Sequence, residues 1–339
     1  MLEYGVYMTR RTKIFLALLI LLPALGFGLV WYFLTTPIFG QVEKRSPVGV
    51  SRQALEEHVQ KLASEFQSRH FENVDKLDQS ANYILSQFHS FGLETHTQNF
   101  QIEGQTYRNI SAFSGPGNSE RLIIGAHYDV YDALPGADDN ASGVAGLLEL
   151  ARILSVHPPR IQVELVAFSL EEPPNFRTEN MGSFQHASLL GWQDPKIKLM
   201  ISLEMIGYFS EEPGSQSYPF PLLSLIYPDR GNFIAIVGKL GENRLVRTAK
   251  RGMASSMDLP LYSMNGPSIL PGIDFSDHLN YWKKDIPAIM ITDTAFFRNP
   301  YYHTEDDLPT SLNYENMAKV VQGVYGIVLE FEPPKGKTL

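Results

Sequence analysis

Residues 126–143 combine one histidine with four carboxylates in a short stretch, AHYDVYDALPGADDNASG. The stretch directly follows the apolar run 122–124, which is typical of a buried strand. Unpaired carboxylates are costly to bury, so either this segment is a solvated loop or a positive charge lies among its carboxylates. A divalent metal ion would supply that charge. The polar residues in question are His127, Asp129, Asp132, Asp138 and Asp139.

Polar side chains also follow three other short apolar runs, which are predicted strands. Because the active residues of open α/β sheets gather at the carboxyl ends of strands, we expect these side chains to share one edge of a sheet. Imidazole nitrogens and carboxylate oxygens are ligands that zinc accepts, and carboxylates can bridge two ions. Each residue alone could instead cap a helix or be exposed, but their joint placement favours a metal site. These residues are Glu171 and Glu172 after residues 161–168, Glu204 after residues 199–203, and His303 beyond residues 286–291.

The elements that must position these residues form a recognisable pattern. Short apolar runs alternate with helical stretches, which predicts an α/β fold with a mostly parallel sheet. Ser51 is expected to cap the first helix of the domain, and a second helix is predicted over residues 80–91. Apolar residues alternate on both sides of Gly104, which predicts a hairpin. Residues 209–273 are rich in Pro, Gly and Ser, and we expect long surface loops there. Within that segment a strand is predicted over 233–237 and a helix over 242–252.

Composition narrows the possible functions. The 339 residues carry a net charge of −9 and show no stripe of Lys and Arg, so nucleic acid is not an expected partner. The chain has no cysteine, which excludes disulfides, thiolate ligands and cysteine nucleophiles. Any metal ion must therefore be held by His, Asp or Glu.

The amino-terminal region predicts a membrane anchor. Arg10, Arg11 and Lys13 precede the uncharged apolar run 14–34, which is about long enough to span a bilayer. A cleaved signal peptide is the alternative, but the run is long for one and no A-x-A site follows it. The positive-inside rule places the amino terminus in the cytoplasm and the remainder across the membrane. The expected organisation is a cytoplasmic segment over 1–13, a transmembrane anchor over 14–34, a linker over 35–50, a catalytic domain over 51–332 and a tail over 333–339.

As a set, the motifs resemble the zinc aminopeptidase family that includes bacterial leucyl aminopeptidases, glutamate carboxypeptidases and glutaminyl cyclases. The resemblance covers roughly residues 51–332 and is densest in GAHYD, GADDNASG, LEEPP, LEMIGY, SDH and YYHTEDD. It implies a three-layer α/β/α sandwich with a mixed, mostly parallel central sheet. In this chain one amino-terminal transmembrane helix is expected to precede that domain.

The resemblance also implies a ligand set for two Zn²⁺ ions per chain. His127, Asp138 and Glu204 would hold one ion. Asp138, Glu172 and His303 would hold the other, so that Asp138 bridges the two. Many aminopeptidases of the family carry Asp where this chain has Glu204, whose extra methylene shifts the carboxylate.

Two further residues match catalytic positions of the family. Glu171 matches the general base, a role that suits a carboxylate beside the metals that is not itself a ligand. Asp129 matches the carboxylate that orients His127 and fixes its tautomer.

Three residues near the expected site keep open roles. Asp277 and His278 match the SDH motif, and they could contact substrate, support the ligands or begin a structural helix. Arg298, like Arg177, could bind a substrate carboxylate or form a structural ion pair.

Together these observations predict a membrane-anchored zinc exopeptidase with its catalytic domain outside the cytoplasm and peptides as substrates. An aminopeptidase is the favoured type of exopeptidase. A dipeptidase or carboxypeptidase of the same fold is one alternative. A glutaminyl-cyclase-like acyltransferase is another, although it is expected to use one zinc, and the paired Glu171 and Glu172 favour a two-metal hydrolase. A non-catalytic scaffolding domain is expected to lack ligands or base, whereas this chain has both. The sequence identifies neither the substrate nor the oligomeric state.

Overall fold

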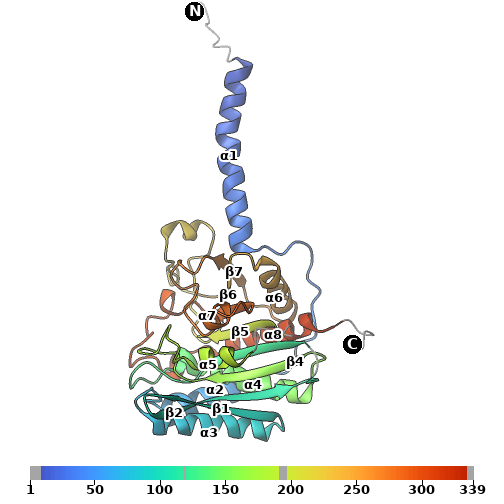
Figure 1. Cartoon of the computed structure of the whole chain (residues 1–339). Helices are drawn as coiled ribbons and strands as arrows, with labels where there is room; N and C mark the ends of the chain where they lie inside the picture. Colours follow the sequence, from blue (N-terminus) through green and yellow to red (C-terminus); the bar gives the residue numbers. More distant parts are fainter. Residues whose placement is uncertain (1–8, 118–119, 191–196, 334–339) are drawn as a thin grey trace, which may run out of the picture.

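The computed structural model describes residues 9–117, 120–190 and 197–333. Its centre is an eight-stranded sheet in the order β1-β2-β4-β3-β5-β8-β6-β7 (Figure 1). The central strands β4, β3, β5 and β8 are parallel, whereas β1 and β2 form an antiparallel hairpin and β6 runs antiparallel to β8. The strands are β1 (Glu94–Ile102), β2 (Gln105–Ser114), β3 (Arg121–His127), β4 (Gln162–Phe168), β5 (Ile197–Glu204), β6 (Ile234–Lys239), β7 (Leu261–Gly266) and β8 (Ala288–Thr292).

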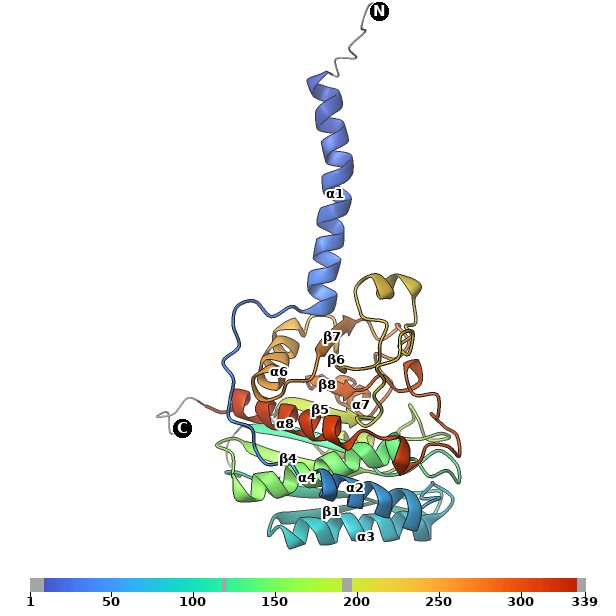
Figure 2. The ribbon, with the colours of Figure 1, turned by 180° about the vertical axis from the view of Figure 1, so that it is seen from behind.

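Helices cover both faces of this sheet, which confirms the predicted three-layer α/β/α architecture. On one face lie α2, α3, α4, α6 and α8, and on the other lie α5 and α7 (Figures 1 and 2). The helices of the domain are α2 (Arg52–Gln60), α3 (Val74–Ser90), α4 (Gly143–Val156), α5 (Gly182–Leu189), α6 (Asn243–Ser256), α7 (His278–Trp282) and α8 (Tyr314–Phe331). Shorter π and 3-10 turns are η1 (Lys61–Glu65), η2 (Ala137–Ser142), η3 (Pro221–Leu225), η4 (Ala295–Phe297) and η5 (Pro309–Ser311).

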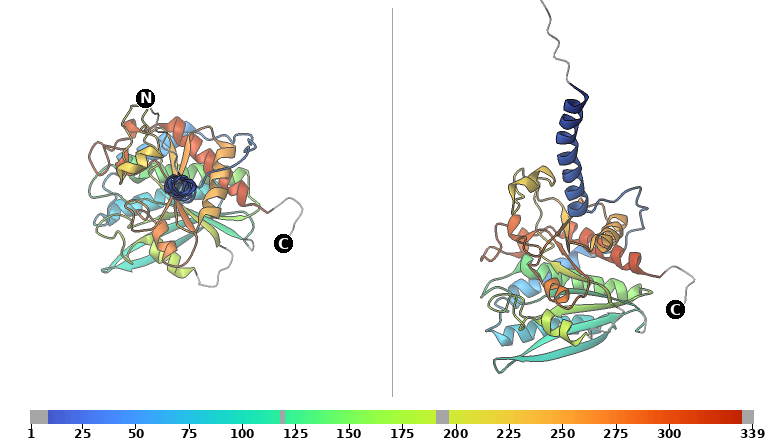
Figure 3. Two further views of the ribbon diagram at one scale, coloured as in Figure 1. Left: turned by 90° about the horizontal axis from the view of Figure 1, so that it is seen from above. Right: turned by 45° about the horizontal axis from the view of Figure 1, so that its top comes forward.

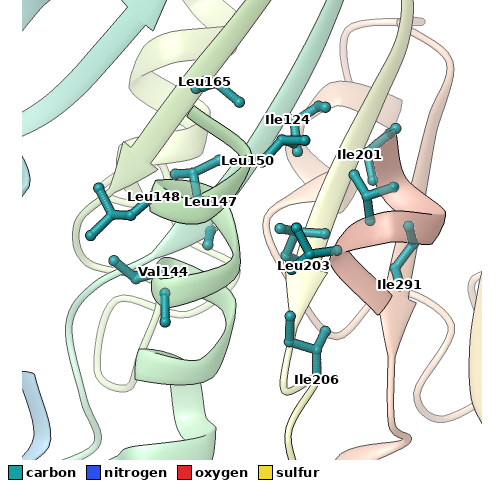
Figure 4. Close-up of a cluster of buried hydrophobic side chains, with 14 of the residues drawn as sticks. Ile124, Val144, Leu147, Leu148, Leu150, Leu165, Ile201, Leu203, Ile206 and Ile291 are labelled. Carbon is teal, nitrogen blue, oxygen red and sulfur yellow. The ribbon is translucent and has the colours of Figure 1, made fainter. Parts of the chain in front are cut away.

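The middle parts of the central strands are mostly apolar because both of their faces are covered. In β3, Leu122 and Ile124 belong to the larger core beneath α4 and α8, whereas Ile123 belongs to the smaller core beneath α5 and α7. This follows from the alternation of side chains along a strand. Figure 4 shows Leu147 and Leu150 of α4 packed among the strand residues of the larger core.

Local signals placed most of the elements correctly. The Ser51 hydroxyl accepts a hydrogen bond from the amide of Ala54 at 3.1 Å, which confirms the predicted helix cap. The hairpin around Gly104 is confirmed, while α3 begins earlier than the predicted residue 80. Strand β7 was not predicted, because its short sequence LYSMNG lacks a clear apolar alternation. It pairs with β6 at the edge of the sheet.

An isolated helix precedes the domain. Helix α1 (Arg10–Thr35) has a mean hydropathy of 2.5 in its most apolar stretch, and none of that stretch is buried. It is long and apolar enough to cross a membrane, and it stands over the domain in Figure 3. The following residues 37–50 lack helix or strand but contact the domain, since the Arg45 amide donates to the Ser255 carbonyl at 2.8 Å. Residues 1–8 and 334–339, where parts of the expected cytoplasmic segment and tail fall, lie outside the described residues.

Candidate active site

The carboxyl ends of four parallel strands meet at one edge of the sheet. Strand β3 ends at His127 and β5 ends at Glu204. Glu171 and Glu172 follow β4, and His303 lies in the loop after β8. The sequence analysis expected these residues at one edge, and the structure brings them together there.

Asp139 lies between the two histidines and faces both. Its Oδ1 is 3.4 Å from Nε2 of His127, and its Oδ2 is 3.1 Å from Nε2 of His303. Each histidine also faces a second carboxylate. Glu204 Oε2 is 3.4 Å from His127 Nε2, and Glu172 Oε2 is 3.3 Å from His303 Nε2. Two groups of three potential ligands therefore share the Asp139 carboxylate, and a third, overlapping group consists of His127, Glu171 and Glu172. In each group the ligand atoms lie within 4.8 Å of one another.

The position of the shared carboxylate corrects the sequence analysis, which expected Asp138. The Asp138 carboxylate points away from the histidines and accepts hydrogen bonds from the Gly207 amide at 2.9 Å and the Asn299 side chain at 2.8 Å. Asp307 fixes this turn, because its two carboxylate oxygens accept the amides of Asp138 and Asp139 at 2.9 and 3.1 Å. Two adjacent side chains therefore point in different directions, and the second one reaches the site.

Asp138 also lies in an environment that disfavours its charge. Burial, and then the nearby Asp293 carboxylate, raise the pKa of Asp138 well above its usual range. This environment disfavours the charged form of Asp138, which suits a hydrogen-bonding role.

The residues present fit a zinc site. Among the described residues, Nε2 of His127, Nε2 of His303 and Oε1 of Glu172 are buried yet have no hydrogen-bond partner. Buried polar atoms are normally paired, so three unpaired ligand atoms that converge call for a cation. Two imidazoles with several carboxylates are a donor set that zinc accepts.

The electrostatics of the group agree with this requirement. Burial and the Asp139 carboxylate raise the pKa of Glu172 to about 8. Burial lowers the pKa of His303, but Asp139 and Glu172 outweigh burial and raise it to about 10. Carboxylates so close together repel one another without a cation between them, and a divalent ion would relieve this repulsion.

Glu171 lies beside the two groups that share Asp139 and belongs to neither of them, although it forms the third group with His127 and Glu172. Its Oε2 is 4.0 Å from His127 Nε2, further than the carboxylates of Asp139 and Glu204. Burial is the main cause that raises its pKa well above the usual range, and the neighbouring Glu204 carboxylate adds to the effect. A buried carboxylate of raised pKa is suited to accept and return a proton.

Asp129 positions several of these residues at once. Its carboxylate oxygens accept the amides of Glu171 at 3.1 Å and Glu172 at 3.0 Å. Its Oδ1 is also 3.5 Å from Nδ1 of His127, whose opposite nitrogen faces Asp139. The backbone carbonyl of Asp129 lies 3.2 Å from the same Nδ1. These contacts suit the orienting role that is expected of Asp129 from the sequence.

Replacing Asp129 by Asn should weaken both metal binding and catalysis. The amide has one oxygen instead of two, so it cannot accept both Glu171 and Glu172 amides and also serve His127. Loss of a residue that is hydrogen-bonded to metal ligands typically lowers metal affinity or activity about 10- to 100-fold, and we expect a change of about this size. Chelator competition and initial rates of peptide hydrolysis would measure it. Asp132→Asn, at an exposed position in the same stretch, is the control and should change neither.

The site opens into a cavity of about 180 Å³. Its polar wall includes the carboxylates and His303, and most of its remaining wall is aromatic or aliphatic. The described lining contains no lysine or arginine. The ionisable residues Asp139, Glu171, Glu172, Glu204 and His303 lie on its polar wall, together with Gln216, Ser217, Ser263, Thr292 and Thr294. Its mostly apolar wall includes Phe176, Tyr218, Tyr227, Phe233, Val237, Tyr262, Phe275, Met290, Phe296 and Tyr302.

The structure does not place three other predicted residues on this cavity. Asp277 and His278 begin α7 and are fully buried. Burial raises the pKa of Asp277 to about 7 and lowers that of His278 to about 4, and Nε2 of His278 pairs with the Ile273 carbonyl at 2.7 Å. Arg298 is buried and donates to the Phe233 carbonyl at 2.8 Å. Of the two roles expected for Arg298, this contact favours the structural one over binding of a substrate carboxylate.

Several residues around the site had not been singled out from the sequence. The Ser276 hydroxyl of the SDH motif donates to Glu204 Oε2 at 2.7 Å and so orients a potential ligand. The Asn140 side chain accepts the Met205 amide at 3.1 Å and donates to the Leu203 carbonyl at 2.8 Å, which ties the start of α4 to the end of β5. Both residues lie within motifs that the sequence analysis quoted, but their types alone do not reveal these roles.

Arg69 is a further residue that the sequence did not reveal. Its guanidinium is fully buried and donates to the carbonyls of Tyr128, Pro135 and Gly136 at 2.7 to 2.8 Å, and to that of Leu62 at 3.0 Å. These contacts hold the loop that joins β3 to the Asp139 turn. Burial lowers its pKa to about 10, so it remains charged at neutral pH.

Replacing Arg69 by Met should reduce the free energy of unfolding by about 3–5 kcal/mol, since it removes one member of a buried, charge-assisted network and leaves carbonyls unpaired. Chemical denaturation of the full chain in detergent would measure this change. Arg52→Met is the matched control, because Arg52 forms an exposed ion pair with Glu315 and should cost at most about 1 kcal/mol. Equal losses for the two variants would contradict the role of Arg69.

Buried histidine and carboxylate side chains, with Asp139 shared between two groups of them, lie at the carboxyl ends of the strands of an α/β/α sandwich. This arrangement is typical of a metal-dependent hydrolase. The family follows from the sequence match: residues 109–328 match Peptidase family M28, and the chain belongs to this family. It is a zinc metallopeptidase by family and fold.

Individual relatives agree with this placement. The chain is 51% identical over 287 residues to the uncharacterized protein YfbL of Escherichia coli (strain K12), with 82% of this chain and 88% of that protein covered. It is 24% identical over 280 residues to a probable leucine aminopeptidase of Arthroderma otae, with 78% and 69% covered. The crystal structure of BSAP, a zinc aminopeptidase from Bacillus subtilis, shares the fold with a TM-score of 0.69 at 16% identity, covering 86% of this chain and 98% of that chain.

Proposed function

We propose that this chain is a membrane-anchored aminopeptidase that holds two zinc ions. The observation that carries the proposal is the pair of three-ligand groups that share Asp139. Glu171 is in neither of these two groups, and its Oε2 is further from His127 Nε2 than the carboxylates of Asp139 and Glu204 are. His127, Asp139 and Glu204 would hold one ion, and Asp139, Glu172 and His303 the other. When bound, zinc supplies Lewis acidity that polarises a peptide carbonyl and makes a water molecule nucleophilic at neutral pH.

The protein's own residues would handle the proton and the geometry. Glu171 would take the proton of the attacking water and return it to the amine that leaves. Its raised pKa suits both halves of this transfer. Asp129 would hold Glu171 and His127 in position through the contacts described above.

The lining of the cavity supports action at the amino end of a peptide. The described lining contains no lysine or arginine that could pair with a terminal carboxylate. Its carboxylates could accept hydrogen bonds from an ammonium group beside the zinc ions, whose positive charge would largely offset that of the carboxylates. Arg298, the cation that could have bound a substrate carboxylate, is buried and does not line the cavity, and its Nε and Nη1 donate to Gln216 and to the Phe233 carbonyl. A free amino terminus is therefore the feature we expect the enzyme to require.

Helix α1 would anchor the enzyme in a membrane. Arg10, Arg11 and Lys13 at its amino-terminal end favour a cytoplasmic location for that end. The catalytic domain would then lie on the opposite side of the membrane.

The test combines zinc content with peptide specificity, using the full chain in detergent. We expect two zinc ions per chain by elemental analysis and release of the first residue from peptides with a free amino terminus. The same peptides with an acetylated amino terminus should not be cleaved. Release of carboxyl-terminal residues would indicate a carboxypeptidase, and cyclisation of amino-terminal glutamine with one zinc per chain would indicate a glutaminyl-cyclase-like enzyme.

A further inference from the structure

The loop between β5 and β6 carries an exposed apolar tip beside α1. Phe220, Leu222 and Leu225, in and next to η3, are 45%, 74% and 75% exposed. In Figures 1 and 2, which show opposite sides of the molecule, η3 (yellow) rises next to the base of α1. Three large apolar side chains so close together on an exposed loop tip suggest a surface that contacts something apolar.

The base of α1 is fixed to the domain by hydrogen bonds. The Thr35 carbonyl accepts bonds from Lys250 Nζ at 3.0 Å and from the Ser263 hydroxyl at 2.5 Å. The Phe33 carbonyl accepts a bond from the Asn243 side chain at 2.6 Å. These donors belong to α6 and β7, so the helix does not meet the domain through a free linker.

This attachment determines how close the domain lies to a membrane. The apolar run 14–34 is about 30 Å long at the usual ~1.5 Å rise per residue, which matches the thickness of the hydrocarbon core. The run ends where α1 enters the domain, and Trp31 and Tyr32 near this end suit the interfacial region. The surface of the bilayer would therefore meet the top of the domain, at the level of η3 (Figure 3).

We propose that Phe220, Leu222 and Leu225 insert into the bilayer surface that α1 crosses and form a second membrane contact of the enzyme. This inference rests on the membrane anchor proposed above. The occupant is lipid, because the fixed base of α1 presents these side chains to the boundary between headgroups and acyl chains, where exposed apolar side chains bind.

The second contact would have a consequence for substrate entry. Tyr218 and Tyr227, which flank the apolar tip in the chain, line the active-site cavity, and the Tyr227 hydroxyl donates to the Ser263 carbonyl at 2.8 Å. Ser263 also lines the cavity and binds the Thr35 carbonyl of α1. The cavity wall is thus joined directly to both membrane contacts, so peptides that lie at the membrane surface would be close to the site.

Site-directed fluorescence can test this contact, because the chain contains no native cysteine. The full chain with Leu222→Cys would carry an environment-sensitive fluorophore and be reconstituted in phosphatidylcholine vesicles. Nitroxide groups on the lipids, placed either near the headgroup or in the middle of the acyl chain, would act as quenchers. Leu189→Cys is the matched control, since Leu189 is 69% exposed at the end of α5, away from α1 in Figure 1. Leu22→Cys within α1 reports the anchor itself.

We expect quenching at position 222 to exceed that at position 189 several-fold, and to be stronger with the nitroxide near the headgroup. Quenching at position 22 together with equal, weak quenching at 222 and 189 would overturn the second contact but leave the anchor intact. A blue shift at 222 without lipid quenching would show that protein covers the tip, and would also overturn the inference. Absence of quenching at position 22 would instead overturn the proposed anchor, and the second contact with it.

Discussion

Replacing Glu171 by Gln is expected to remove nearly all peptide hydrolysis and to leave zinc bound. The amide cannot accept a proton from the attacking water, whereas the proposed ligands His127, Asp139, Glu172, Glu204 and His303 are unchanged. General acid–base groups typically contribute 10²–10⁴-fold, and kcat should fall by about this factor. Initial rates of release of the first residue, measured together with the zinc content of the same samples, would check both parts.

Two outcomes would contradict the role of Glu171. Hydrolysis near the original rate with zinc retained would show that another group moves the proton. Loss of zinc along with activity would show that Glu171 is a ligand, as a metal ion held by the group His127, Glu171 and Glu172 would require. Glu212→Gln, at an exposed position on the loop after β5, is the matched control and should leave both zinc and activity unchanged.

The edge of the sheet that holds the site could be predicted from sequence because it depends on short-range patterns. Apolar runs identify the buried strands, and parallel pairing then brings their carboxyl ends together. The observed registers, in which His127 pairs with Phe168 and Glu204 with Thr292, place the ends of β3, β4, β5 and β8 side by side. The types of the residues after each strand were enough to suggest metal chemistry.

The direction of individual side chains could not be predicted in the same way. The choice between Asp138 and Asp139 depends on Asp307, which lies far along the chain and binds both backbone amides. The role of Arg298 depends likewise on the Phe233 carbonyl, 65 residues away. Such contacts form only in the folded chain, and no local pattern of the sequence encodes them.

The Asp138–Asp139 pair offers a direct comparison of the two assignments. Asp139→Asn should lose zinc, because an amide is a poor bridge between two cations and only one of its atoms is an acceptor. The Asp139 carboxylate faces both histidines. The loss of zinc affinity should therefore exceed the roughly 10- to 100-fold loss expected when a residue hydrogen-bonded to the ligands, such as Asp129, is replaced.

Asp138→Asn should be much milder and serves as the matched variant. Burial and Asp293 already favour the protonated form of Asp138, and an amide preserves its shape and much of its hydrogen bonding. Chelator competition on the two variants, with thermal unfolding to show that both are folded, would separate them. If Asp138→Asn lost zinc and Asp139→Asn kept it, the sequence-based bridge would be right and the geometry of the turn would need revision. The opposite result would show that one backbone turn, fixed by Asp307, selects which of two identical neighbours becomes the bridge.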